Sequence, residues 1–204
     1  MSRSGQAVDH LLPLAQCGDT DALGQLLERY RNYLELLARL QISRRLQSKV
    51  DAADLVQETF LDAHATFAEF RGSTERELVA WLRRVLAFNL ASLVRYYCGT
   101  RRRNVDLERE LAGALDESSC ALDRGLVATT SSPSQQAARH EQAVVIADAL
   151  GRLPADYREV IILRQLEGLT FPEVARQMNR SQDSVKKLWV RGLAQLRSAL
   201  GDEP

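Results

Sequence analysis

Apolar residues recur at three- and four-residue spacing along almost every ordered stretch of this 204-residue chain, and no run alternates between apolar and polar residues. Such spacing gives each helix one apolar stripe, whereas a half-buried strand would need strict alternation. The chain is therefore expected to be all-α. After a short N-terminal helix, turn signals place helices over residues 21–45, 52–70, 75–97, 136–150, 153–166, 171–178 and 182–200.

One stretch between these helices has the composition of a linker. Residues 104–138 carry six acidic and two basic side chains, for a charge of −4, and include the polar run 128–134. We expect an irregular, flexible segment with a transient helix at Leu107–Leu115. The predicted organisation is two small helical domains, residues 8–103 and 139–201, joined by a flexible acidic linker, with a helix-turn-helix in the second domain.

Charge is distributed unevenly along the chain. The formal net charge is zero, because 27 Lys and Arg residues balance 27 Asp and Glu residues. Residues 51–77 nevertheless sum to −5, residues 81–103 to +6 with six Arg and no acid, and residues 176–197 to +5. A neutral total argues against nucleic-acid binding only when the charge is evenly spread. This segregation instead indicates two kinds of partner.

Several classes of protein have no support in the sequence. No run approaches 18 apolar residues, so membrane insertion is not expected. Cys17, Cys98 and Cys120 lie far apart without metal-ligand spacing, so we expect neither a metal nor a disulfide, but free thiols in a reducing cytoplasm. The three histidines are isolated, and no phosphate-binding or nucleophile motif is present. We therefore expect no cofactor and no enzymatic activity.

The strongest local signal is a helix-turn-helix within residues 167–200. Thr170 and Glu173 can form a capping box for its first helix, and Asn179 stands at a turn position that often needs a positive φ. Ser181 can cap the second helix. The alternative is a helical hairpin with a solvated charged face, and Trp189 could belong to the core or contact DNA. The residues expected to contact DNA are Ser181, Gln182, Ser184, Lys186, Lys187 and Arg191.

The helix expected at residues 52–70 has one apolar face and one acidic face. The apolar stripe consists of Val56, Phe60, Ala63, Phe67 and Phe70. The pattern leaves two interpretations open for the opposite face, a solvated surface or a docking site for a basic partner protein. That opposite face carries Asp54, Gln57, Glu58, Leu61 and Asp62.

The helix expected at residues 75–97 combines basic and aromatic residues. Arg83, Arg84 and Arg95 are interleaved with aromatic rings, a combination that suits single-stranded nucleic acid, because bases stack on rings while phosphates pair with Arg. The alternative, which we favour for Trp81, Val85 and Phe88, is that these three residues belong to the core. Asn89 interrupts an apolar row and needs a polar partner, which could be the backbone or a base edge.

Taken together, these segments resemble the extracytoplasmic-function (ECF) sigma factors of bacterial RNA polymerase. The resemblance extends from about Asp9 to Leu200, apart from the linker, and its specificity comes from the order and spacing of the matching runs. Asn179 departs from the pattern, since the family often has Gly there. The matching runs are Gly18–Leu34, Asp54–Gly72, Trp81–Ala91, Leu153–Met178 and Ser184–Arg197.

The resemblance assigns a role to each candidate surface. The family's D-x-V-Q-E-x-F segment docks on the clamp helices of the largest polymerase subunit, so Asp54, Gln57, Glu58, Leu61 and Asp62 would bind the core enzyme. The family's W-L-x-R-I-A-x-N segment faces the minus-ten promoter element, where its Asn holds a flipped base. That role is assigned to Asn89, with Arg83, Arg84 and Arg95 on nearby phosphates.

The second domain would then read the minus-thirty-five element, and an anti-sigma factor is a further expected partner. We also weigh the hypothesis that the acidic linker mimics nucleic acid in the active-site channel of the polymerase. Two rival classes remain: a DNA-binding regulator that acts without core polymerase, and an enzyme with a helical accessory domain. The regulator would leave the acidic helix without a role, and no catalytic constellation supports the enzyme.

Overall fold

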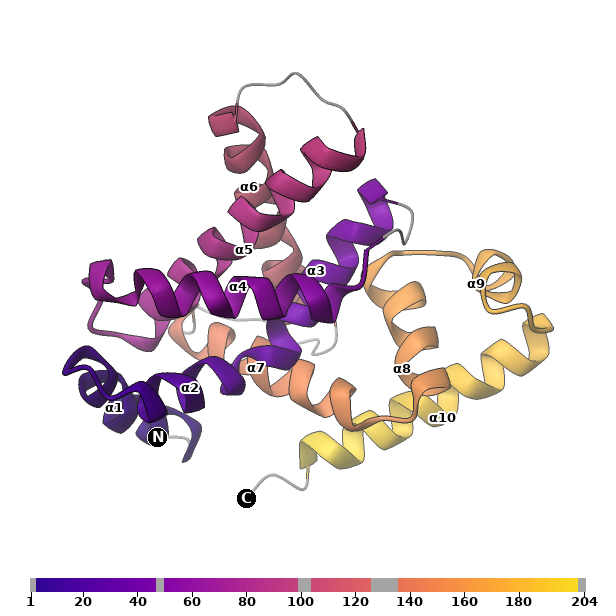
Figure 1. Ribbon diagram of the computed structural model, residues 1–204. Coiled ribbons are helices and arrows are strands. Elements are labelled where there is room, and N and C mark those ends of the chain that lie inside the picture. The colour runs from indigo at the N-terminus through magenta and orange to yellow at the C-terminus, as the bar shows by residue number, and fades with distance from the viewer. Residues whose placement is uncertain (1–2, 47–49, 99–103, 126–135, 202–204) are drawn as a thin grey trace. The chain divides into compact units, whose positions relative to one another are not determined.

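The computed structural model describes residues 3–46, 50–98, 104–125 and 136–201 (Figure 1). Every regular element in these ranges is helical, which confirms the predicted all-α class. The chain divides into two compact units, residues 1–119 and 120–204. The first unit contains α1 (Arg3–Gln16), α2 (Thr20–Arg29), α3 (Arg31–Leu46), α4 (Ala52–Thr66), the 3-10 turn η1 (Phe67–Glu69), α5 (Glu75–Cys98) and most of α6 (Asn104–Gly125).

The single helix expected over residues 21–45 is two helices, because the chain bends at Tyr30. This residue caps the end of α2 with φ −97° and ψ 4°, and its side chain is fully buried. Its hydroxyl donates to the Glu75 carboxylate at 2.9 Å, which ties the α2–α3 junction to the first turn of α5. Burial and the adjacent Glu75 raise the pKa of Tyr30 far above its usual value. A tertiary contact therefore outweighs the local helical propensity here.

Local capping fixes where α4 and α5 begin. The Asp51 carboxylate accepts from the Ala53 backbone N–H at 2.9 Å, and α4 starts at the next residue after Asp51. At the start of α5, Thr74 Oγ1 accepts from the Glu77 N–H, while the Glu77 carboxylate accepts from the Ser73 and Thr74 N–H groups. These bonds, with Ser73 the largest contributor, lower the pKa of Glu77.

The expectation of an irregular segment from residue 104 is wrong over α6. Leu107, Leu111 and Leu115 recur at four-residue spacing and are at most 3% exposed, so burial of this stripe outweighs the acidic composition. Polar contacts also join α6 to α3: Gln41 Nε2 donates to Ser118 Oγ at 3.0 Å. The described part of the predicted linker up to Gly125 is thus helical, and residues 126–135 lie outside the described ranges.

The second unit is built on the long helix α10. Its core includes Val160, Ile161, Val174, Val185 and Leu196, all at most 2% exposed. Gly192 is buried where α10 meets α8, since a Cβ there would lie 3.2 Å from the Tyr157 Cβ. The elements of this unit are α7 (Gln136–Arg152), α8 (Ala155–Ile161), the π-helical turn η3 (Ile162–Leu166), α9 (Phe171–Gln177) and α10 (Gln182–Gly201).

Candidate functional site

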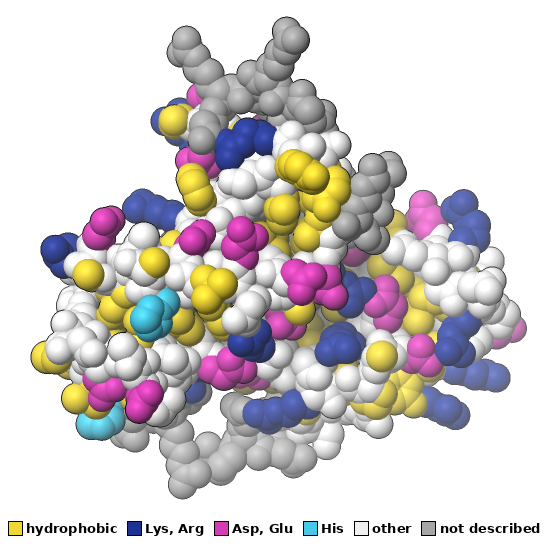
Figure 2. All heavy atoms as spheres, in the orientation of Figure 1, with side chains coloured by type: hydrophobic (Ala, Val, Ile, Leu, Met, Phe, Trp, Pro, Cys, Tyr) yellow, Lys and Arg dark blue, Asp and Glu magenta, His cyan; other side chains and the backbone are white. Residues whose placement is uncertain are grey.

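One face of α4 is acidic and exposed, as the sequence predicted. The stripe of Val56, Phe60, Ala63, Phe67 and Phe70 is buried, and Figure 2 shows acidic side chains along the outward face of α4. On that face Leu61 is 64% exposed. Of the predicted set, Asp62 is half-buried, and Asp54, Gln57 and Glu58 are exposed.

The arginines of α5 divide into an internal one and outward ones. Arg83 is 8% exposed, and it donates to the Asp116 carboxylate of α6 at 2.7 Å and to the Tyr33 hydroxyl at 3.0 Å. Burial lowers the pKa of Arg83, but the neighbouring Tyr33 and Asp116 raise it by more, so the pKa of Arg83 is raised overall. Arg83 therefore stays charged, and Asp116 balances its charge within the unit. The structure therefore does not present Arg83 to a phosphate.

Arg84 and Arg95 keep more of their surface. Arg84 is exposed and forms no ion pair with another residue in the described part of the chain. Arg95 is half-buried, donates to Ser92 Oγ at 2.8 Å and lies 3.9 Å from the Glu108 carboxylate. Arg84 is thus the predicted minus-ten residue that the structure leaves most available for a phosphate.

The structure places Asn89 inside the first unit. This side chain is 5% exposed, and its Nδ2 lies 3.5 Å from Thr59 Oγ1 of α4, so its partner is internal. The family segment has its Asn seven positions after Trp, and the seventh position after Trp81 is Phe88. One residue turns a helix by about 100°, which moves the side chain from the outer surface to the interior.

Phe88 was expected in the core, and that prediction is wrong, because its ring is 48% exposed. Trp81, by contrast, packs on Phe67 and Phe70 with ring centroids 5.7 and 5.3 Å away. Helical spacing alone groups Trp81, Val85 and Phe88 on one stripe of α5. The last of these residues, Phe88, is nevertheless exposed to solvent. An exposed aromatic ring therefore lies one turn after Arg84 on α5.

The helix-turn-helix has the predicted local geometry. The Glu173 carboxylate accepts from Oγ1 and from the backbone N–H of Thr170, at 2.6 and 2.7 Å, and these bonds lower the pKa of Glu173. Asn179 has φ 50°, the left-handed turn conformation expected at this position. The Ser184 N–H donates to Ser181 Oγ at 3.3 Å, which caps α10.

The N-terminal half of α10 presents a polar face. Val185 is fully buried against the unit's core, which directs the opposite side of the helix outward. Trp189 packs edge-on against Phe171 at 5.7 Å, so this ring belongs largely to the packing between α9 and α10. Of the predicted DNA-contacting residues, Ser184 is half-buried, and the exposed ones are Ser181, Gln182, Lys186, Lys187 and Arg191.

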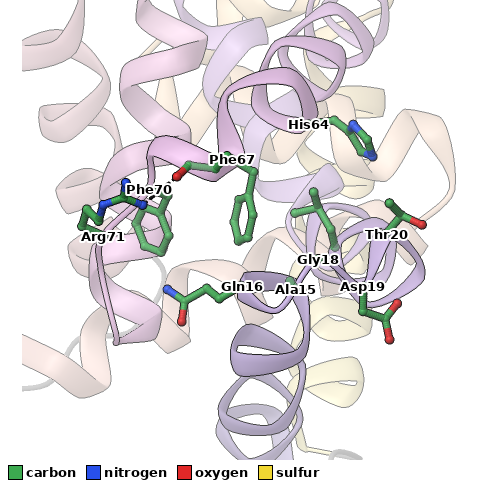
Figure 3. Close-up of a pocket in the computed structure, with 11 residues that line it drawn as sticks. Ala15, Gln16, Gly18, Asp19, Thr20, His64, Phe67, Phe70 and Arg71 are labelled. Carbon is green, nitrogen blue, oxygen red and sulfur yellow. Dashed lines mark hydrogen bonds between the residues drawn. The ribbon is translucent and has the colours of Figure 1, made fainter.

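A hollow of about 380 Å³ lies between the α1–α2 turn and the end of α4. Figure 3 shows Phe67 reaching toward it above Gln16. Gln16 Nε2 donates to the Gly72 carbonyl at 2.7 Å, and the Asp19 carboxylate accepts from two backbone N–H groups in the first turn of α2. These polar groups hold a turn and a helix cap, so we assign the hollow to the packing of the unit.

The sequence did not indicate that α6 packs as part of the first unit. A groove lies between α5 and α6, and Arg84, Phe88, Arg109 and Gly113 are among the residues that line it. The leucine stripe of α6 could have indicated a packed helix, but the acidic composition and the polar run after it favoured a linker. Within the described ranges, no helix is long and apolar enough to cross a membrane, and no His, Cys, Asp and Glu side chains cluster as metal ligands.

Comparison with known proteins identifies the family of both units. Residues 29–101 match the family described as Sigma-70 region 2, and residues 143–196 match Sigma-70, region 4. An ECF RNA polymerase sigma-E factor of Haemophilus influenzae is 31% identical over 169 residues, which cover 83% of this chain and 82% of that protein. RNA polymerase sigma factor CnrH of Cupriavidus metallidurans is 29% identical over 187 residues, with 91% and 90% covered.

A solved structure of CnrH in complex with the cytosolic domain of CnrY aligns with 97% of this chain and 99% of that chain, at 26% identity and a TM-score of 0.37. The sequence matches cover both sigma regions. The acidic α4 face and the capped helix-turn-helix are consistent with the same family. The chain belongs to the ECF sigma factors of bacterial RNA polymerase, the proteins that direct transcription initiation.

Proposed function

We propose that residues 8–103 bind core RNA polymerase and the minus-ten element, and that residues 139–201 read the minus-thirty-five element. The chain acts as a non-enzymatic initiation factor in the cytoplasm. Its partners are the core enzyme, promoter DNA and an anti-sigma factor, the last of which rests on the family alone. The observation that carries the proposal is the exposed α4 face, because a regulator acting without polymerase would have no use for it.

Core binding is supported by the chemistry of that face. Glu58 and Asp54 are exposed acids beside Leu61, which is 64% exposed. Acidic side chains around one exposed aliphatic residue suit a basic protein surface with an apolar centre, where the apolar contact supplies affinity and the charges fix orientation. The clamp helices of the largest polymerase subunit are the proposed partner, as the family segment implies.

Promoter reading is supported by the exposed basic side chains of α10 and α5. Lys186, Lys187 and Arg191 can neutralise phosphates or contact guanine, and the capped N-terminus of α10 favours a nearby phosphate. In the first unit, Arg84 takes the minus-ten phosphate role. The internal ion pair of Arg83 and the burial of Asn89 argue against direct DNA contacts by those two side chains.

The test of this proposal is a Glu58→Arg variant in co-elution with purified core polymerase. Glu58 is exposed, so the substitution should leave the fold intact while placing a positive charge against a basic surface. We expect the wild type to co-elute with core and the variant to elute alone, with equal thermal unfolding temperatures. Glu69→Arg changes an exposed acid in η1, off the predicted face, and should co-elute. Equal core binding by all three proteins would refute docking through α4.

A further inference from the structure

The acidic side chains of α6 lie against arginines of the neighbouring helices. Residues 104–119 carry five acidic residues and one basic residue, and Figure 1 shows α6 beside α5. The shortest distances from guanidinium nitrogen to carboxylate oxygen are 2.7 Å for Arg83 and Asp116, 3.0 Å for Arg45 and Glu110, and 3.9 Å for Arg95 and Glu108. The negative charge of α6 is therefore placed on basic side chains of α3 and α5.

Two of these arginines belong to the set expected on minus-ten DNA. Arg83 and Arg95 are paired with carboxylates of α6, whereas Arg84, the third of that set, is exposed and forms no ion pair with another residue in the described ranges. A carboxylate and a phosphate accept from the same guanidinium donors, so a paired arginine must exchange its partner before it can bind DNA. The carboxylates of α6 thus reduce the basic charge that α5 offers to a phosphate.

Apolar contacts, more than the ion pairs, hold α6 on the first unit. Leu107, Leu111 and Leu115 are at most 3% exposed, and the Tyr33 hydroxyl donates to Ser119 Oγ at 2.9 Å. Burial of large aliphatic side chains stabilises a helix contact far more than partly exposed ion pairs do. One carboxylate can therefore be removed without detaching α6, so its charge and its attachment can be tested separately.

Glu108 is the carboxylate whose partner DNA can reach. The side chain of Arg95 is 27% exposed and that of Glu108 is 28% exposed, and their contact is long at 3.9 Å. The side chain of Arg83 is only 10% exposed and stays inside the unit with Asp116. A phosphate therefore competes with Glu108 for Arg95 more readily than with Asp116 for Arg83.

We propose that α6 is an intramolecular competitor of DNA, in which Glu108 and Asp116 occupy Arg95 and Arg83 and so weaken sequence-independent binding of the chain to DNA. The proposal rests on the DNA-binding part of the proposed function, since it takes α5 as a helix that faces DNA. Non-specific affinity depends on how many phosphates the basic side chains neutralise, whereas promoter recognition adds contacts to bases. Carboxylates that remove phosphate contacts therefore make attachment to DNA depend more on base contacts.

The experiment measures the affinity of the free, full-length chain for a DNA duplex of random sequence, by fluorescence anisotropy at several salt concentrations. We expect Glu108→Gln to bind about threefold more tightly than the wild type, because it releases Arg95 from an exposed ion pair. The slope of log affinity against log salt should become steeper by about one, the signature of one additional phosphate contact. Adding Arg95→Gln to Glu108→Gln should cancel the gain.

A matched control separates the ion pair from the overall charge. Glu117→Gln makes the same change of charge on the same helix, but Glu117 is exposed and forms no ion pair with another residue in the described part of the chain. We expect this variant to bind within about 1.5-fold of the wild type. Equal thermal unfolding temperatures of the wild type, Glu108→Gln and Glu117→Gln would show that α6 stays in place.

Three results would each overturn the proposal. The first is equal tightening by Glu108→Gln and Glu117→Gln, since net charge alone would then explain it. The second is tightening that persists when Arg95→Gln is added, and the third is no tightening by Glu108→Gln. These measurements contain no core polymerase, so a chain that gives the expected affinities but fails to co-elute with core would overturn the proposed core binding and leave the competition by α6 standing.

Discussion

The guanidinium of Arg83 on α5 donates to the carboxylate of Asp116 on α6 across 2.7 Å, joining residues that lie 33 positions apart in the sequence. Arg83 also donates to Tyr33 of α3, so one buried charge holds three helices together. The two groups come from segments that the sequence assigned to different partners, a basic DNA-binding helix and an acidic linker. In the folded unit they neutralise each other, and both side chains line the α5–α6 groove.

The Arg83–Asp116 pair should contribute measurably to stability. Asp116→Asn leaves a nearly buried guanidinium with a weaker acceptor, and we expect it to lower the free energy of unfolding by about 1–2 kcal/mol. Urea unfolding followed by circular dichroism measures the change. Asp106→Asn removes the exposed 4.0 Å contact with Arg109 and should shift stability by less than about 0.5 kcal/mol. Equal effects of the two variants would refute a structural role for the Arg83–Asp116 pair.

The turn of the helix-turn-helix should tolerate only certain residues at position 179. Asn179 has φ 50°, which a β-branched residue adopts at a cost of about 1–2 kcal/mol. Asn179→Val is expected to lower stability by that amount, whereas Asn179→Gly should be neutral or stabilising. Urea unfolding of the full chain measures both. A Val variant as stable as the wild type would contradict the positive φ.

Position 192 should not tolerate even the substitution of Gly192 by Ala without a loss of stability. Its added Cβ would lie 3.2 Å from Ile161 Cδ1 and 3.3 Å from the backbone carbonyl oxygen of Tyr157, and a backbone atom cannot turn aside. We expect Gly192→Ala to destabilise by about 1–3 kcal/mol despite the better helix propensity of Ala. Gly24 is an exposed helical glycine with open space around it, so Gly24→Ala should stabilise by up to about 1 kcal/mol. Thermal unfolding of the two variants should therefore shift in opposite directions.

Lys187 on α10 offers a way to distinguish phosphate contacts from base contacts. If its exposed ammonium lies on a phosphate, Lys187→Gln weakens holoenzyme binding to every promoter equally and lowers the salt slope by about one. If it reads a base, the variant instead loses discrimination at one position of the minus-thirty-five element. We expect the phosphate result, because the side chain is a flexible point charge without a bidentate fork. Promoter variants titrated at several salt concentrations separate the two outcomes.

Features set by residues close in sequence were predictable. The apolar stripe of α4, the Thr170–Glu173 capping interaction and the positive φ of Asn179 depend on neighbours within a few positions, and the structure has all three. The acidic composition of residues 104–125 was misleading, because composition does not register that Leu107, Leu111 and Leu115 share one face.

Features set by distant contacts were not predictable. Nothing near Arg83 in the sequence indicates that Asp116 will neutralise it, so a count of basic residues overestimates the charge available to DNA. Asn89 was matched to the Asn of the family segment, although it lies one residue beyond that position, which Phe88 occupies. At 100° per residue, that shift exchanged an internal amide for an exposed ring.

The most direct test of the central claim is run-off transcription with purified core polymerase on templates that carry candidate two-part promoters. With the wild-type chain we expect a discrete run-off product from a promoter with both elements, and none from core alone or with Glu58→Arg. A chain that binds promoter DNA but gives no product with core polymerase would contradict the account.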